Sequence, residues 1–113
     1  MQRTEKYYEA DAFRREATGR ILAVEPGKTG GKLALDGTVF YPEGGGQPAD
    51  RGTLTLADGT VLHVTDVHES EGVIWHTVDA LPAGAVPGAE AAESIDWEWR
   101  VDKMQQHTGE HSL

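Results

Sequence analysis

The sequence predicts a mainly β fold, a small antiparallel β-barrel followed by one helix. Short apolar segments rich in β-branched and aromatic residues recur along the chain, and glycine-containing turns separate them. One pair of segments flanks Asp58-Gly59, a dipeptide typical of tight hairpin turns. Beyond residue 95 the pattern changes to a run without glycine or proline that lasts until Gly109, as a helix requires.

The predicted strands follow one another closely, and most of them end at a glycine turn. Thr53–Leu56 alternates polar and apolar residues, as a half-buried strand does. The other predicted strands are Arg20–Val24, Lys32–Leu35, Thr38–Tyr41, Thr60–Val67 and Val73–Val78, with Tyr7-Tyr8 expected to pair as a short strand. This spacing predicts a closed or nearly closed antiparallel barrel over residues up to about 78.

The segment that follows the predicted barrel has a sequence that is compatible with a strand or with a helix. Residues 81–88 are rich in proline, glycine and alanine and are expected to form a loop. Ala89–Ile95 is ambiguous, because alanine and glutamate favour a helix while a barrel needs a closing strand. We expect a strand up to about Ile95 and a helix from Asp96, which is a good N-cap and is followed by Glu98 in the first turn.

Length and composition limit the classes of function. The 113 residues suffice for one domain with a modest core, and no apolar run approaches the roughly 20 residues of a membrane span. The N-terminus lacks the apolar core of a signal peptide, and there is no cysteine, so we expect a cytoplasmic protein. The net charge of -9 argues against a broad nucleic-acid-binding face, which would be basic.

Two histidines near the end of the chain have the spacing of metal ligands. His107 and His111 are four residues apart, and in a helix they share a side with Arg100 and Met104, so both imidazoles can reach one ion. A catalytic zinc takes three protein ligands and a structural zinc takes four, so this pair is half of a site. The alternative is a helix that carries two solvated or hydrogen-bonded histidines.

The glycine-rich stretch is the least ordinary part of the sequence. Three consecutive glycines, Gly44 to Gly46, cost backbone entropy on folding and are useful where φ must be positive or another group must touch the main chain. Gln47 adds amide donors and an acceptor. The alternative is a long β-turn without a binding role. A phosphate-binding P-loop is excluded, because no Lys-Ser/Thr follows the glycines.

Together the two stretches resemble a known family, the alanyl-tRNA editing proteins of the AlaX type, and the editing region of alanyl-tRNA synthetase is similar. The residues that carry the resemblance are Phe40-Tyr41-Pro42-Glu43-Gly44-Gly45-Gly46-Gln47-Pro48-x-Asp50-x-Gly52, Ile95-Asp96-Trp97, Arg100, Met104 and His107-Thr108-Gly109-Glu110-His111-x-Leu113. The pair of motifs, in this order and separation, is far more specific than either motif alone.

The resemblance implies a division of the chain. Residues 1–95 would form a translation-protein-like β-barrel that carries the glycine-rich loop, and residues 96–113 would begin a larger α/β editing domain. The chain would then be the N-terminal part of an editing protein, cut just inside its second domain.

The resemblance also implies an activity and a set of site residues. Members of the family hydrolyse serine or glycine mischarged onto alanine tRNA, which is the expected partner. By that likeness His107 and His111 bind zinc, and the loop of Gly44, Gly45, Gly46 and Gln47 approaches the editing pocket. The family completes its zinc site with a Cys-x-x-x-His pair in the following domain, whereas this chain has no cysteine. We therefore expect an incomplete zinc site and no editing by this chain alone, and no catalytic residue is assigned.

Two other interpretations are open. The residues from His107 to His111 also fit H-x-x-E-H, a zinc-peptidase signature in which Glu110 would be the general base. The second is a non-catalytic β-barrel that serves as a binding module. His63 and His76 fall in predicted strands and His68 in a predicted loop, and we expect none of the three to be catalytic.

Overall fold

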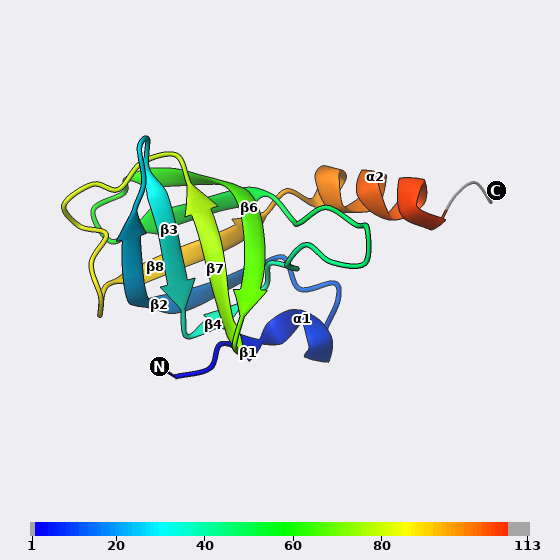
Figure 1. Cartoon of the computed structure of the whole chain (residues 1–113), viewed down its shortest axis with the longest axis horizontal. Coiled ribbons are helices and arrows are strands. Elements are labelled where there is room, and N and C mark those ends of the chain that lie inside the picture. Colours follow the sequence, from blue (N-terminus) through cyan, green and yellow to red (C-terminus); the bar gives the residue numbers. More distant parts are fainter. Residues whose placement is uncertain (1, 109–113) are drawn as a thin grey trace.

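Six antiparallel strands close into a barrel in the computed structural model, which describes residues 2–108 and the side chains of residues 2–105. Around the barrel the strands follow the order β2-β3-β7-β6-β5-β8 (Figure 1). Their bounds are Glu16–Pro26 for β2, Gly31–Leu35 for β3, Gly52–Leu56 for β5, Val61–Ser70 for β6, Val73–Val78 for β7 and Glu90–Ile95 for β8. The predicted antiparallel barrel is thus confirmed.

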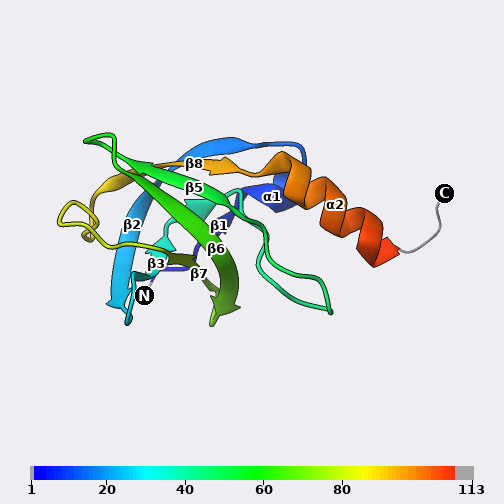
Figure 2. The same cartoon turned by 90° about the horizontal axis from the view of Figure 1, so that it is seen from above.

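Three short elements and one longer helix complete the fold. Strand β1 (Glu5–Lys6) pairs in parallel with β4 (Gly37–Thr38), and helix α1 (Tyr7–Ala10) follows β1 directly. Helix α2 (Trp97–Thr108) follows β8 and projects from one end of the barrel (Figures 1 and 2). The predicted change from strand to helix at residues 95 and 96 is therefore confirmed.

Strand β8 closes the barrel, because it pairs with β2 along one edge and with β5 along the other. Its side chains alternate, with Ala91, Glu93 and Ile95 buried. The alanines and glutamates of this segment would favour a helix in isolation. Hydrogen bonds to two neighbouring strands and burial of one face outweigh that preference, as tertiary context often does.

Glycines mark the tight connections that the sequence predicted. Gly59 has a φ of 91° in the hairpin between β5 and β6, where the Leu56 amide donates to the Thr60 carbonyl at 2.9 Å. Gly30, with a φ of 84°, lies so close to β7 that a Cβ there would be 2.2 Å from the Val78 carbonyl oxygen. A side chain at position 30 would therefore meet both backbone strain and a clash.

Two predicted strands are corrected. Thr38–Tyr41 was expected to be a strand, but β4 ends at Thr38 and the next two residues leave the sheet to fill the core. There the Val39 amide donates to the Glu93 carboxylate at 2.8 Å and its carbonyl accepts from Arg100, so side chains replace a neighbouring strand. Tyr7-Tyr8 lies in α1 rather than in a strand, and the Tyr8 ring packs on the Tyr41 ring with 4.2 Å between the ring centroids.

Two polar side chains in the core hold the segment that leads to the glycine-rich loop. His76 is fully buried, and its Nδ1 donates to the Leu33 carbonyl at 3.1 Å, which leaves Nε2 to accept from the Thr38 hydroxyl at 2.8 Å. Burial lowers the pKa of His76 to about 4, so the ring is neutral at pH 7. Glu93 Oε1 binds the Val39 amide, while Oε2 has no hydrogen-bond partner among the described residues.

Glu93 is expected to make the stability of the protein depend on pH. Burial raises the pKa of its carboxyl from the usual 4.5 to about 7 in the folded state. Between these values the folded chain holds a proton that the unfolded chain releases, so stability falls as pH rises and stays lower above pH 7. From this group we expect a loss on the order of 3 kcal/mol of unfolding free energy from acidic pH to about pH 8. Urea titrations of Glu93→Gln, which is neutral throughout, should lack this loss.

The matched control for this prediction is Glu90→Gln, because Glu90 is exposed on the same strand. It should keep the wild-type dependence on pH. Parallel curves for Glu93→Gln and wild type would show that folding does not raise the pKa of the Glu93 carboxyl.

Candidate active site between the glycine-rich loop and helix α2

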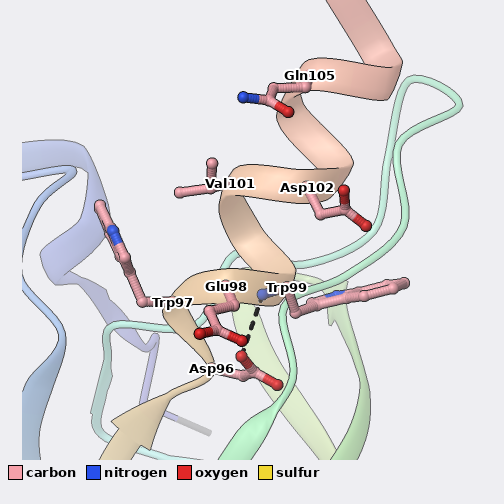
Figure 3. A pocket seen from close by; sticks show the side chains of 7 residues that line it. All are labelled: Asp96, Trp97, Glu98, Trp99, Val101, Asp102 and Gln105. Carbon is pink, nitrogen blue, oxygen red and sulfur yellow. Dashed lines mark hydrogen bonds between the residues drawn. The ribbon is translucent and has the colours of Figure 1, made fainter.

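Helix α2 begins with the predicted N-cap. The Asp96 carboxylate accepts a hydrogen bond from the Trp99 amide at 3.1 Å, the dashed line in Figure 3. The Asp96 amide in turn donates to the Arg51 carbonyl at 2.7 Å, which ties the start of the helix to the end of the glycine-rich loop. Capping and this backbone contact together fix where the helix leaves the barrel.

The tip of the glycine-rich loop is a tight hairpin. Gly44 and Gln47 exchange backbone hydrogen bonds of 2.9 and 3.1 Å, and the two glycines between them have φ values of 59° and 82°. Apart from the adjoining residues of the chain, no described atom lies within 4 Å of the position that a Cβ would take at Gly44, Gly45 or Gly46. Positive φ rather than lack of space therefore explains glycine at positions 45 and 46, and all three glycines are exposed.

The neck of the loop is closed by Tyr41 and Asp50. The Asp50 amide donates to the Tyr41 carbonyl at 3.0 Å, and the Tyr41 amide donates to the Asp50 carboxylate at 2.9 Å. In the first half of the loop, the Glu43 amide donates to the Val67 carbonyl of β6 at 2.9 Å. The first half of the loop is thus anchored to the barrel.

The second half of the loop is anchored to α2 instead. Three successive residues of the loop accept hydrogen bonds from the helix: the Pro48 carbonyl from Lys103 Nζ at 2.9 Å, the Ala49 carbonyl from Trp99 Nε1 at 2.8 Å, and the Asp50 carboxylate from Arg100. Both views show the loop extending from the barrel on the same side as α2 (Figures 1 and 2). The loop and the helix consequently form one unit.

A buried cluster of charges lies at the contact between loop and helix. Asp50 is 0 % exposed, and Arg100 and Lys103 are 2 % and 4 % exposed, with Lys103 Nζ 3.0 Å from the carboxylate. Arg100 also donates to the Val39 carbonyl at 3.0 Å and to the Ala12 carbonyl at 2.6 Å. Burial lowers the pKa of Lys103 and the Asp50 carboxylate opposes this shift, so the pair stabilises the charged form that burial disfavours.

A largely apolar pocket of about 570 Å³ lies between the loop and α2. Tyr41, Pro42 and Gln47 of the loop line it, together with Phe13 after α1 and Met104 of the helix. Several of its large apolar side chains are exposed, including Phe13 at 77 % and Met104 at 50 %. The pocket offers a largely apolar surface with two side-chain amides, those of Gln47 and Gln105, which suits recognition of a small, mostly uncharged group.

A second depression, of about 630 Å³, lies on the outer side of α2 (Figure 3). Trp97 and Trp99 point to opposite sides of the helix there, and acidic residues lie between them. Arg15 stacks on the Trp97 ring at 4.2 Å and Arg51 on the Trp99 ring at 4.0 Å. The glycine-rich loop does not line this depression, so we place the candidate site in the other pocket.

The predicted zinc ligands fall at the end of the described part. His107 lies in the described backbone of α2, four residues after Lys103, while its side chain and the whole of His111 lie outside what the structure describes. No group of three or more histidine, cysteine, aspartate or glutamate residues among the described ones could hold a metal ion. The metal pair therefore stays a prediction.

The other histidines lie apart from the pocket. His63 is exposed on β6, and its Nδ1 is 3.1 Å from the Asp79 carboxylate. His68 was expected in a loop but belongs to β6, where it pairs with Trp75 of β7. His63, His68 and the buried His76 are all absent from the lining of the loop–helix pocket.

Sequence reasoning missed the buried charge cluster. Asp50 and Arg100 both stand in the two motifs, but a pattern of residue types does not show that they are in contact. Lys103 carried no signal, because a lysine in a helix is more often solvated than buried.

Comparison with known proteins identifies the family. Residues 7–99 match the family described as tRNA synthetases class II (A). The chain belongs to this family. It is 41 % identical over 111 residues to the alanyl-tRNA editing proteins AlaX-L and AlaX-M of Pyrococcus horikoshii, with 96 % and 97 % of the chain aligned. It is 41 % identical over 113 residues to the alanine–tRNA ligase of Pyrobaculum neutrophilum. The resemblance seen in the two motifs is thus confirmed.

This family member covers a minor part of each of these relatives. It spans 27 % of AlaX-L, 47 % of AlaX-M and 12 % of the ligase. Within the described part of the chain, no helix is long and apolar enough to cross a membrane.

Proposed function

We propose that this chain forms the N-terminal part of a zinc-dependent alanyl-tRNA editing protein, which hydrolyses serine or glycine mischarged onto alanine tRNA. The observation that carries the proposal is the pocket bounded by both the glycine-rich loop and α2. The relatives named as alanyl-tRNA editing proteins support the same function. Residues 1–95 would be the barrel domain and residues 96–113 the beginning of the editing domain, in a cytoplasmic protein whose partner is alanine tRNA.

The proposed zinc site combines ligands of this chain with ligands from another polypeptide segment. His107 and His111 supply two imidazoles, a ligand type that suits Zn²⁺. The chain contains no cysteine, so a thiolate ligand would have to come from another polypeptide segment. Zinc, when bound, can lower the pKa of a water molecule or orient the substrate.

The chain's own residues would receive the aminoacyl end of the tRNA. Tyr41 and Met104 provide an apolar surface that excludes water, and the Gln47 amide can donate to or accept from a polar group of the substrate. Arg100 and Lys103 are held by Asp50 and by backbone carbonyls, so their role is to keep the pocket in shape. The net charge of -9 implies that most of the attraction for tRNA comes from outside this chain.

The test is hydrolysis of charged tRNA by the native protein, meaning the longer editing protein of which this chain would be the N-terminal part, loaded with zinc. Seryl and glycyl esters of alanine tRNA should be hydrolysed faster than the alanyl ester, and removal of zinc should abolish the difference. Binding of the mischarged tRNA without hydrolysis would favour a non-catalytic binding module instead. Cleavage of peptides would favour the zinc-peptidase interpretation.

The 113-residue chain alone is expected to bind zinc weakly and to hydrolyse no tRNA ester. Two neutral imidazoles supply half of a closed site, and water would fill the other positions. Zinc titration followed by calorimetry, with the mass measured in solution, checks this. Tight one-to-one binding by a monomer would contradict the prediction and show that other residues complete the site.

A further inference from the structure

The carboxylate of Asp50 makes contacts on both sides of the neck of the glycine-rich loop and with α2. Asp50 binds Tyr41 across the neck of the loop through its amide and its side chain. The same side chain binds Arg100 and Lys103 of α2. It therefore joins the two sides of the neck to each other and to the helix.

The hydrogen bonds within the tip of the loop do not fix the orientation of the tip relative to the barrel and α2. The hairpin from Gly44 to Gln47 is ordered by its own two hydrogen bonds, and no described atom comes within Cβ contact of its glycines. Pro48 stiffens the short connection between Gln47 and the neck. The position of the Gln47 side chain in the pocket is consequently set by the neck and by the contacts of residues 48–50 with α2.

We propose that Asp50 is a positioning residue, whose negative charge fixes the glycine-rich loop on α2 and thereby places Gln47 relative to the His107 region of the helix. This inference rests on the proposed editing function, and Asp50 acts through Gln47. Its fully buried carboxylate has no route to a ligand in the pocket. Small displacements of a positioning group cost large factors in rate, because reacting groups must be held within a fraction of an ångström.

Variants that differ in the net charge of the cluster can distinguish a positioning role of Asp50 from a role in folding alone. Two cations and one carboxylate leave one positive charge in excess. Asp50→Asn raises the excess to two and should lower stability. Adding Lys103→Met returns the excess to one, but it also removes the bond to the Pro48 carbonyl. The double variant therefore restores the net charge of the cluster but lacks both the Asp50 carboxylate and the Lys103 bond that hold the loop on the helix.

The experiment measures kcat and KM for mischarged tRNA in the native protein, at a temperature where circular dichroism shows every variant folded. Asp50→Asn and the double variant should each lower kcat at least about 10-fold with KM changed less than about 3-fold. The control is Asp79→Asn, another carboxylate that ties two segments through a backbone amide, the His63 amide. This control should keep the wild-type kcat. Wild-type kcat in either folded Asp50 variant would overturn the proposal.

A second readout does not depend on activity. The Trp99 indole N–H donates to the Ala49 carbonyl, next to Asp50, so its hydrogen exchange reports the loop–helix contact. Exchange should become at least about 10-fold faster in both Asp50 variants, while the amides of β5 keep their protection. If wild type hydrolyses no tRNA ester, the proposed function fails, and this exchange alone decides the positioning role. Unchanged indole exchange would overturn it.

Discussion

Gln47→Ala in the native protein is expected to lower kcat for mischarged tRNA by about 10²-fold, the usual cost of losing one well-placed polar contact to the reacting group. The thermal midpoint should stay within about 1 °C of wild type. The reason is that the structural bonds of Gln47 are made by its backbone to Gly44, which alanine retains. The Gln47 side chain itself lines the pocket.

Glu43→Ala is the control for this variant, because Glu43 is exposed on the same loop and its anchoring bond is also a backbone bond. It should keep wild-type activity. Equal losses of activity and stability in Gln47→Ala would make the loop a structural element. An unchanged kcat in Gln47→Ala would show that the Gln47 side chain does not take part in the reaction.

Arg100→Met is expected to lower the unfolding free energy by about 3 kcal/mol, as the loss of one partner in a buried ion pair does. Arg100 joins α2 to three other parts of the chain, through the Asp50 carboxylate and the carbonyls of Val39 and Ala12. Methionine keeps much of the volume but leaves these acceptors without their donor. Urea unfolding followed by tryptophan fluorescence measures the change, since two of the three tryptophans lie in α2.

The exposed Arg20 provides the matched control. Its ion pair with Glu90 spans 3.4 Å and is more than half exposed, so Arg20→Met should cost less than about 1 kcal/mol. If the two methionine variants unfold at the same urea concentration, the cluster around Asp50 contributes little to the stability of the loop–helix unit.

The barrel could be predicted because its signals are local. Turn dipeptides such as Asp58-Gly59, and alternation in segments such as Thr53–Leu56, report backbone geometry within a few residues. The closing strand was the harder case, and the argument that settled it came from topology, since a barrel without β8 would have two open edges. The N-cap at Asp96 is likewise a local signal, and its hydrogen bond is present.

The departures from prediction have long-range causes. The strand expected at Thr38–Tyr41 ends early because Glu93 and Arg100, more than 50 residues away in the sequence, satisfy the Val39 backbone. Through the family resemblance, the loop of residues 44–47 was predicted to approach an editing pocket. Its walls required the structure, because Phe13 and Tyr41 meet α2 only through tertiary packing. No local sequence pattern indicates such a tertiary contact.

Binding of the aminoacyl end to the loop–helix pocket is tested most directly by chemical-shift mapping on the native protein in the presence of zinc. The ligand is 3′-seryl-amino-3′-deoxyadenosine, a non-hydrolysable analogue of a mischarged tRNA end. We expect the largest shifts in the amides of residues 44–47 and in the Met104 methyl group, which line or adjoin the pocket. Shifts confined to the outer side of α2, around Glu98 and Asp102, would contradict it.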